Sequence, residues 1–251
     1  MPENKHTEPT EEKPERIAKV LARAGLCSRR EAERWIGDGR VRVNGKVLDS
    51  PALTVTSADA VEVDGKPLPG AEKTRLWRYH KPAGLVTTNS DPEGRATVFD
   101  KLPKDLPRVL TVGRLDLNSE GLLLLTNDGG LARRLELPDT GWTRRYRVRV
   151  HGHVDEKRLE SLAKGITVDG VRYGPIIAEL ESVQRSNAWL AIKLTEGKNR
   201  EIRKVLNHLG LDVTRLLRTA YGPFQLGKMR RGEVFEVTGK VLKEQVGTLP
   251  S

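Results

Sequence analysis

Apolar residues recur at helical spacing near the start of the chain. The first set falls at positions i, i+3, i+4 and i+7 and comprises Ile17, Val20, Leu21 and Ala24. Gly25 can end this helix, and the spacing of Ser28 and Glu31 is that of a capping box, which opens a second helix. The apolar face of the second helix comprises Ala32, Trp35 and Ile36. The pattern predicts a pair of short helices that ends near Gly39.

Short strands follow the helix pair. Val41 and Val43 alternate with arginines, as in a strand with one buried face. Asn44-Gly45 and Asp64-Gly65 are strong signals for tight hairpin turns. The proline- and glycine-containing segment 65–70 then predicts a linker, so the first module is expected to end near Gly70.

Beyond the linker, many apolar strand patterns alternate with a few helix patterns. Strands are predicted around residues 76–80, 85–88, 109–112, 122–126, 146–150, 176–181, 189–194, 213–218 and 234–237. Helices are predicted at 128–135, capped by Asp128, at 156–164, capped by Asp155, and at 200–209, capped by Asn199. Many strands with few helices predict an α+β fold built on a mixed or antiparallel sheet.

Composition narrows the class of protein. The chain has 251 residues, of which 37% are hydrophobic and 31% charged, which is typical of a globular protein with a charged surface. No stretch approaches the roughly 18 apolar residues of a membrane span, and residues 1–16 are too polar for a signal peptide. The single cysteine, Cys27, excludes an internal disulfide. We therefore expect a cytoplasmic protein without a membrane partner.

The charge is strongly basic and unevenly distributed. The formal net charge is +10, and such a balance favours a polyanionic partner over a merely solvated surface. Residues 1–14 are rich in acidic side chains and proline, which predicts a disordered tail. Residues 15–48 carry a net charge of +5 and residues 198–231 a net charge of +7. Two separate basic surfaces are expected.

The first of these segments resembles a known RNA-binding module. The sequence "RIAKVLARAGLCSRREAERWIGDGRVRVNGKVL" is similar to the S4 domain, whose helix pair and following strand present basic side chains to structured RNA. Arg29 and Arg30 lie in the first turn of the second helix, away from its apolar face, and Arg40 and Arg42 share one face of a strand. All four are candidate phosphate contacts, with scattered surface arginines as the alternative.

An unusual segment, "VGRLDLNSEGLLLLTNDGGLARRL", spans residues 112–135. It reads as a strand that ends in Gly113-Arg-Leu-Asp116, then a polar turn and an apolar strand. By residue type alone, Asp116 is more often a turn former than a catalytic group. The common phosphate-binding glycine loops, metal-spaced histidines and nucleophile-elbow serine motifs do not occur.

Several motifs in one order change this interpretation. Together "KPAG", "DPEGRATVFDKLP", "GRLDLNSEGLLLLTNDG", "RRYRVRV" and "EGKNREIRK" resemble the RNA pseudouridine synthases that combine an S4 domain with a catalytic domain. The resemblance implies a small RNA-binding domain at 15–70 and a larger catalytic domain at 75–240, followed by a tail at 241–251. It also implies that Asp116, in the "RLD" motif, is the catalytic residue.

The same resemblance assigns further roles. It implies that Arg203 stabilises the ionised aspartate, that Tyr146 stacks on the target base, and that Arg114 fills the space left by the extruded nucleotide. Arg203 lies at the margin of its helix's apolar stripe, so it can face a cleft. Arg200 and Lys204 are candidate phosphate contacts. Leu226 is a candidate apolar wall beneath the base, with core packing as an equal alternative.

The implied reaction isomerises uridine to pseudouridine in ribosomal RNA, with 23S rRNA, free or in an assembling large subunit, as the implied partner. Such an isomerisation needs neither a redox change nor an energy input, so no cofactor and no metal are expected, and we expect a monomer. The rival from another class is a non-catalytic ribosome-assembly factor with the same fold. That rival explains the basic surfaces but not the combination of Asp116, Tyr146 and Arg203.

Overall fold

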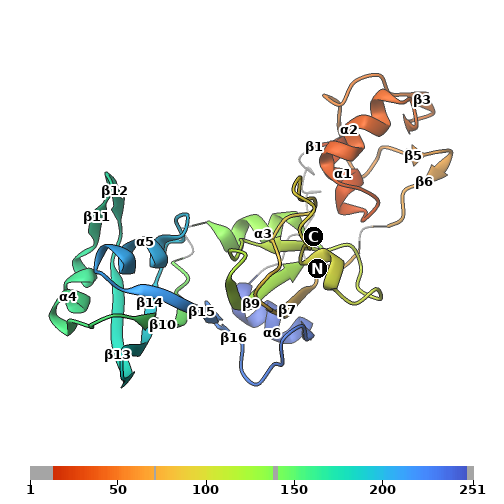
Figure 1. Ribbon diagram of the computed structural model, residues 1–251. Helices are drawn as coiled ribbons and strands as arrows, with labels where there is room; N and C mark the ends of the chain where they lie inside the picture. Colours follow the sequence, from red (N-terminus) through yellow and green to blue (C-terminus); the bar gives the residue numbers. More distant parts are fainter. Residues whose placement is uncertain (1–13, 71, 138–140, 248–251) are drawn as a thin grey trace, which may run out of the picture. The chain divides into compact units, whose positions relative to one another are not determined.

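The computed structural model describes residues 14–70, 72–137 and 141–247 (Figure 1). The chain divides into two compact units, residues 1–73 and 74–251. Except for Pro14, the tail predicted at 1–14 lies outside the described residues. In the described part of the chain, no helix combines the length and apolar content that a bilayer span requires.

The first unit contains the predicted helix pair and short strands. The helices are α1 (Ile17–Arg23) and α2 (Arg29–Gly37), and both sides of the predicted capping box between Ser28 and Glu31 are present. One four-stranded sheet has the order β3-β2-β5-β6, and a two-stranded sheet pairs β1 with β4. The strands are β1 (Glu15–Arg16), β2 (Val41–Val43), β3 (Lys46–Val47), β4 (Thr54–Val55), β5 (Val61–Val63) and β6 (Lys66–Pro67).

The two predicted hairpin turns are confirmed. Asn44 and Gly45 have φ angles of 51° and 77°, and Asp64 and Gly65 have φ angles of 51° and 74°. Positive φ at both central residues is the requirement of a type I′ turn, which explains why Asn-Gly and Asp-Gly stand there. The turns join β2 to β3 and β5 to β6, and the pairing of β2 with β5 brings Val41, Val43, Val61 and Val63 into one core with the helix pair.

A nine-stranded mixed sheet organises the second unit. Its order is β13-β14-β10-β15-β9-β7-β17, with β16 paired to β15 and β8 paired to β9. The strands are β7 (Leu76–Lys81), β8 (Leu110–Val112), β9 (Ser119–Thr126), β10 (Arg144–His151), β13 (Ile176–Gln184), β14 (Asn187–Leu194), β15 (Asp212–Tyr221), β16 (Phe224–Gln225) and β17 (Val234–Val237). A separate hairpin pairs β11 (Ile166–Val168) with β12 (Val171–Tyr173).

The two halves of this sheet meet where β9 and β15 pair in parallel. Ser119, Glu120 and Gly121 of β9 face Leu216, Leu217 and Arg218 of β15. Further along β9, residues 124–126 pair with β8 instead. A Cβ on Gly121 would lie 2.3 Å from the carbonyl oxygen of Arg218, so this close approach of the two strands requires glycine.

Helices cover the sheet halves separately (Figure 1). In one half, α4 (Glu156–Ser161) and α5 (Glu201–His208) enclose a core against β10, β13 and β14. In the other, α3 (Gly129–Glu136) and α6 (Gly239–Val246) pack on β7 and β9. The described part of the unit also contains the short 3-10 helices η1 (Phe99–Lys101) and η3 (Leu162–Lys164).

Four sequence predictions in this unit need correction. Residues 85–88 form no strand but one isolated bridge between Val86 and Thr97, and the Thr87 side chain bonds to the backbone of Leu115. The helix predicted at 156–164 changes to 3-10 geometry after Ser161. Asn199 does not cap α5; the cap residue is Arg200, without a capping side chain. The tail predicted at 241–251 overlaps α6, whose Leu242 and Val246 are buried.

Candidate active site

Asp116 lies on the turn between β8 and β9, at the edge of β9 where β15 replaces β8 as the neighbouring strand. The turn is closed by a hydrogen bond from the Ser119 N–H to the Asp116 carbonyl, 3.0 Å long. The Thr87 hydroxyl donates to the Leu115 carbonyl at 2.8 Å. These bonds fix the backbone on both sides of Asp116, while 30% of its side chain remains exposed.

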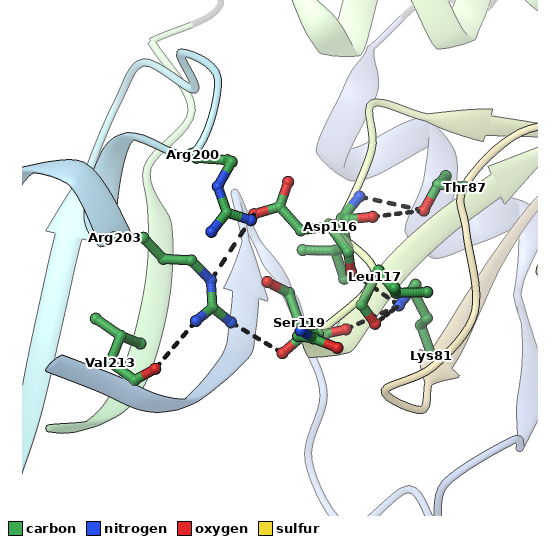
Figure 2. A network of polar contacts seen from close by, with 10 residues as sticks. Lys81, Thr87, Asp116, Leu117, Ser119, Arg200, Arg203 and Val213 are labelled. Carbon is green, nitrogen blue, oxygen red and sulfur yellow. Dashed lines mark hydrogen bonds and ion pairs between the residues drawn. The ribbon is translucent and has the colours of Figure 1, made fainter.

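A buried lysine contacts the backbone of this turn (Figure 2). Lys81, at the end of β7, is fully buried, and its ammonium group donates to the carbonyls of Ser119 at 2.8 Å and of Asp116 at 3.1 Å. A third bond, also 3.1 Å long, goes to the carbonyl of Pro82. Burial lowers the pKa of Lys81 to about 8, and the nearby carboxylates of Asp116 and Glu120 oppose that shift. Lys81 therefore acts as a clamp on the backbone of the turn.

Two arginines from the start of α5 face the Asp116 carboxylate (Figure 2). Its Oδ2 atom lies 3.6 Å from Nη1 of Arg200 and 3.9 Å from Nε of Arg203. The guanidinium of Arg203 also donates to the carbonyls of Val213 at 3.1 Å and Asn118 at 2.9 Å. Because one of its bonds goes to Asn118, beside Asp116, Arg203 joins α5 directly to the turn.

The environment of Arg203 disfavours the charge on its guanidinium group. Its side chain is only 14% exposed, and burial, reinforced by neighbouring Arg200, lowers its pKa, while Asp116 opposes the shift. Its Nε atom is buried without a hydrogen-bond partner among the described residues. Arg200 adopts the left-handed conformation, with φ of 51° and ψ of 30°. Backbone strain of this kind concentrates at functional sites, since surrounding structure must enforce it.

A cavity of about 780 Å³ opens around these groups. Its volume is in the range of small-ligand sites. Five predicted site residues line it, namely Arg114, Asp116, Tyr146, Arg200 and Arg203. Tyr146 lies on β10 and packs against the cores of both sheet halves, so it stands at their junction.

The other predicted site residues lie elsewhere. Leu226 does not line this cavity and is buried in the core with α3 and α6, which corresponds to the core-packing alternative. Lys204 is exposed on α5, outside the cavity lining. Arg29, Arg30 and Arg42 are exposed in the first unit. Arg40 pairs there with Asp64, Nε to Oδ1 at 2.9 Å and Nη2 to Oδ2 at 2.6 Å, and stacks on Trp35.

Residue-by-residue sequence reasoning missed two buried arginines in the cavity lining, Arg144 and Arg218. Both guanidinium groups lie over the ring of Tyr221, at 4.8 Å and 5.1 Å from its centroid. Arg218 is 3% exposed, donates to the Leu122 carbonyl at 2.7 Å, and leaves its buried Nη2 without a partner among the described residues. Alternation along β10 places Arg144 on the face of Tyr146 and could have indicated it, whereas no local signal marks Arg218, because strand arginines normally point to solvent.

Buried guanidinium groups make the cavity suited to an anionic or oxygen-rich ligand. Carboxylates in the lining are partly neutralised, since Asp91 pairs with Arg95 at 2.8 Å and Glu196 with Lys198 at 2.8 Å. Asp116 stands among the cations as a carboxylate that can act as a nucleophile or a base. The arrangement fits a nucleotide with its phosphates.

Comparisons with known proteins agree with this chemistry. A family model described as RNA pseudouridylate synthase matches residues 75–208, and one described as S4 domain matches residues 15–61. A Rickettsia bellii protein named "Uncharacterized RNA pseudouridine synthase" is 49% identical over 229 residues, 91% of this chain and 99% of that protein. The Pseudomonas aeruginosa "Ribosomal large subunit pseudouridine synthase B" is 42% identical, covering 99% of this chain and 66% of that protein.

One solved structure is similar over nearly the whole chain. A crystal structure of a pseudouridylate synthase has a TM-score of 0.64 and 26% sequence identity, and the match covers 92% of this chain and 99% of the other. The likeness therefore includes both units.

Proposed function

The chain belongs to the RNA pseudouridylate synthase family, and on that premise we propose that it isomerises one uridine of 23S ribosomal RNA with Asp116 as the catalytic residue. The isomerase class follows from the family. The ribosomal substrate is supported by the relatives named for the large ribosomal subunit. We propose that the protein acts as a monomer in the cytoplasm, where ribosomal RNA is assembled into ribosomes.

The observation that carries the role of Asp116 is its placement. Its backbone is fixed by Lys81, and its carboxylate faces Arg200 and Arg203 in a cavity large enough for a nucleotide. A catalytic carboxylate needs this combination of an immobile backbone and a partly dry, positively charged surrounding.

The reaction breaks the bond from N1 of uracil to C1′ of the sugar and forms a bond from C5 to C1′. The C5 proton leaves, N1 gains a proton, and no net oxidation occurs. Asp116 serves either by attacking C1′ or by removing the 2′ proton so that a glycal forms. Both routes need an ionised carboxylate, the state that neighbouring guanidinium groups favour in general.

The remaining residues bind and orient the RNA in this proposal. An enzyme that reacts at a nucleoside must first extrude it from its stack, and an aromatic ring then supports the base. Tyr146 supplies that ring, Arg114 occupies the vacated position, and Arg200 contacts a phosphate. The first unit grips a structured part of the RNA through Arg29, Arg30 and Arg42.

The experiment is tritium release from an rRNA transcript labelled at C5 of uridine, with carbodiimide mapping of the modified position. Asp116→Asn keeps the size of the side chain and removes its charge. We expect turnover to fall by at least about 100-fold, the scale of a lost catalytic proton or bond-forming group, while RNA affinity stays within a few-fold. Wild-type protein that binds rRNA but releases no tritium would favour the non-catalytic assembly factor.

A further inference from the structure

Part of the large sheet has a face without a helical cover. Along β10, Val148 and Val150 point into the core formed with α4 and α5, whereas Arg145, Arg147 and Arg149 are exposed on the opposite face. We call this opposite side the open face; besides the three arginines it comprises Trp189 and Lys193 of β14 and Arg215 of β15. Figure 1 shows the four strands β13, β14, β10 and β15 that form it.

Like charges stand directly opposite each other on the open face. Arg145 is the register partner of Lys193, and Arg149 is the register partner of Arg215. Cross-strand neighbours of the same charge destabilise a sheet. A chain that keeps both pairs pays a cost in folding stability, which an anionic ligand would offset.

Two of these arginines are uncompensated within the protein. Arg147 pairs with Glu181 at 2.7 Å, Lys193 with Glu179 at 3.6 Å, and Arg215 with Glu120 at 2.6 Å. Within residues 14–70, 72–137 and 141–247, the side chains of Arg145 and Arg149 form neither an ion pair nor a hydrogen bond. Their guanidinium groups are therefore available to a ligand.

The surface around them is held in shape. The guanidinium of Arg147 lies 4.5 Å from the centre of the Trp189 ring, and that of Arg215 lies 5.9 Å from it. Glu181 and the buried Glu120 fix the same two arginines, as described above. A site whose side chains are already ordered loses less conformational entropy when a ligand binds.

We propose that the open face binds a second segment of the RNA substrate through its phosphates. Arginine is the side chain best suited to phosphate, because its planar fork donates two parallel hydrogen bonds. Alternate residues of a strand are roughly 6.7 Å apart, so Arg145, Arg147 and Arg149 form an evenly spaced row that can follow a nucleic-acid backbone. Trp189, at the centre of the open face, is stacked by the guanidinium groups of Arg147 and Arg215, so the face presents mainly cations, which favours a polyanion over a protein partner.

This segment is distinct from the one in the active site. Tyr146 lines the cavity, and on β10 its side chain points away from the face that carries Arg145 and Arg147. We therefore expect that a minimal stem-loop, which places one nucleotide in the cavity from that side, does not extend to the open face. The inference rests on the proposed function, since it takes the substrate to be a long, folded RNA.

The test compares two RNAs and two protein variants. The RNAs are the smallest stem-loop that is turned over and an extended rRNA fragment that contains it. The variant Arg145→Gln/Arg149→Gln removes the two unpaired charges. The control, Lys157→Gln/Lys164→Gln, removes two exposed charges on α4 and η3, which pack on the other side of the sheet. Affinity is measured across a salt titration, together with single-turnover tritium release.

For the extended RNA we expect the arginine variant to lower the log–log salt slope by about 1.4 to 1.8, since each of the two lost phosphate contacts contributes roughly 0.7 to 0.9. Its affinity for the stem-loop and its turnover of that RNA should match the wild type. The lysine control should change neither slope. Without RNA, the arginine variant should melt at the same or a higher temperature, and heparin should stabilise it less than the wild type.

Three results would overturn the proposal. Equal salt slopes on the extended RNA would mean that phosphates do not contact the open face. Equal losses on both RNAs would mean that the substitutions act through the cavity. A loss of affinity seen only with ribosomal particles, not with naked RNA, would assign the face to a protein. If wild-type protein releases no tritium from either RNA, the proposed function fails, independently of the slopes.

Discussion

The ammonium group of Lys81 bonds to the backbone carbonyl of Asp116, at 3.1 Å, and leaves the carboxylate of that residue to the arginines of α5. The charge of Lys81 thus holds the backbone of Asp116 and not its carboxylate. Positioning and electrostatic stabilisation are supplied by different cations, which makes the two effects separable by substitution.

Lys81→Met should reduce turnover far more than binding. The substitution keeps the buried aliphatic chain and removes the ammonium group that joins the carbonyls of Pro82, Asp116 and Ser119, so the turn is held only by its remaining bonds. We expect the single-turnover rate to fall by about 100-fold or more, as misplacement of a reacting group by about 1 Å does, with RNA affinity within a few-fold.

The control for this substitution is Lys101→Met, at an exposed lysine of η1. It should leave both rate and affinity unchanged. A Lys81→Met protein that remains folded by circular dichroism and keeps its rate would show that the turn is rigid without the lysine.

Glu201 should make folding stability depend on pH. Burial raises its pKa to about 7, above its ordinary value, and the nearby carboxylate of Glu196 adds to the shift. A carboxyl group with a raised pKa in the folded state stabilises the fold at low pH, and this contribution is lost as the pH rises through the folded-state value.

We therefore expect Glu201→Gln to be more stable than the wild type at pH 8.5, by an amount of the order of 3 kcal/mol, and to lose this advantage near pH 4.5. Denaturant unfolding at several pH values measures the difference. The Lys198 N–H donates a hydrogen bond of 2.9 Å to the carboxylate of Glu201, and the glutamine can still accept this bond. A stability difference that does not vary with pH would contradict the assignment.

Gly121→Ala should disrupt the junction of the sheet halves. A Cβ there would lie 2.3 Å from the Arg218 carbonyl oxygen, and the residue has a φ of 106°. We expect a loss of at least about 3 kcal/mol from the combined clash and backbone strain. Gly170→Ala is the matched control, since Gly170 has a φ of 75° but open space around it, and it should cost about 1 kcal/mol. Equal costs in denaturant unfolding would mean that the strands separate easily.

Arg42 and Arg40 should contribute unequally to RNA binding. Arg40 is bound by Asp64 and stacked on Trp35, whereas Arg42 is exposed with no ion pair to a described residue. Arg42→Gln should therefore reduce the log–log salt slope of rRNA binding by roughly 0.7 to 0.9, and Arg40→Gln by less. A larger effect at Arg40 would mean that RNA displaces Asp64.

Local sequence signals predicted most of the helices, strands and turns, because these elements depend on interactions between residues close together in the sequence. Asn44-Gly45, the Ser28 capping box and the alternation in β10 each depend on residues a few positions apart. The missed elements depend on distant contacts. Residues 85–88 have strand-like composition, yet Thr87 bonds to the distant Leu115, and α6 is stabilised by packing Leu242 and Val246 on the core of β7 and β9.

The candidate site divides in the same way. The resemblance to a family supplied Asp116, Arg203 and Tyr146, and the structure brings all three to one cavity. The buried Arg218 has no local signal, because its burial comes from the parallel pairing of β15 with β9. The Lys81 contacts likewise appear only when β7 and the Asp116 turn are seen together.

The parallel pairing of β9 with β15 also bears on how the chain folds. Its partners are about one hundred positions apart in the sequence, so this pairing closes a long loop and belongs to the slow steps of folding. During synthesis, β7, β8 and β9 can associate as soon as they emerge, but β15 does not yet exist. Asp116 and Arg203 therefore meet only after most of the chain has been made, and a nascent protein can hold RNA with its first unit before it can modify it.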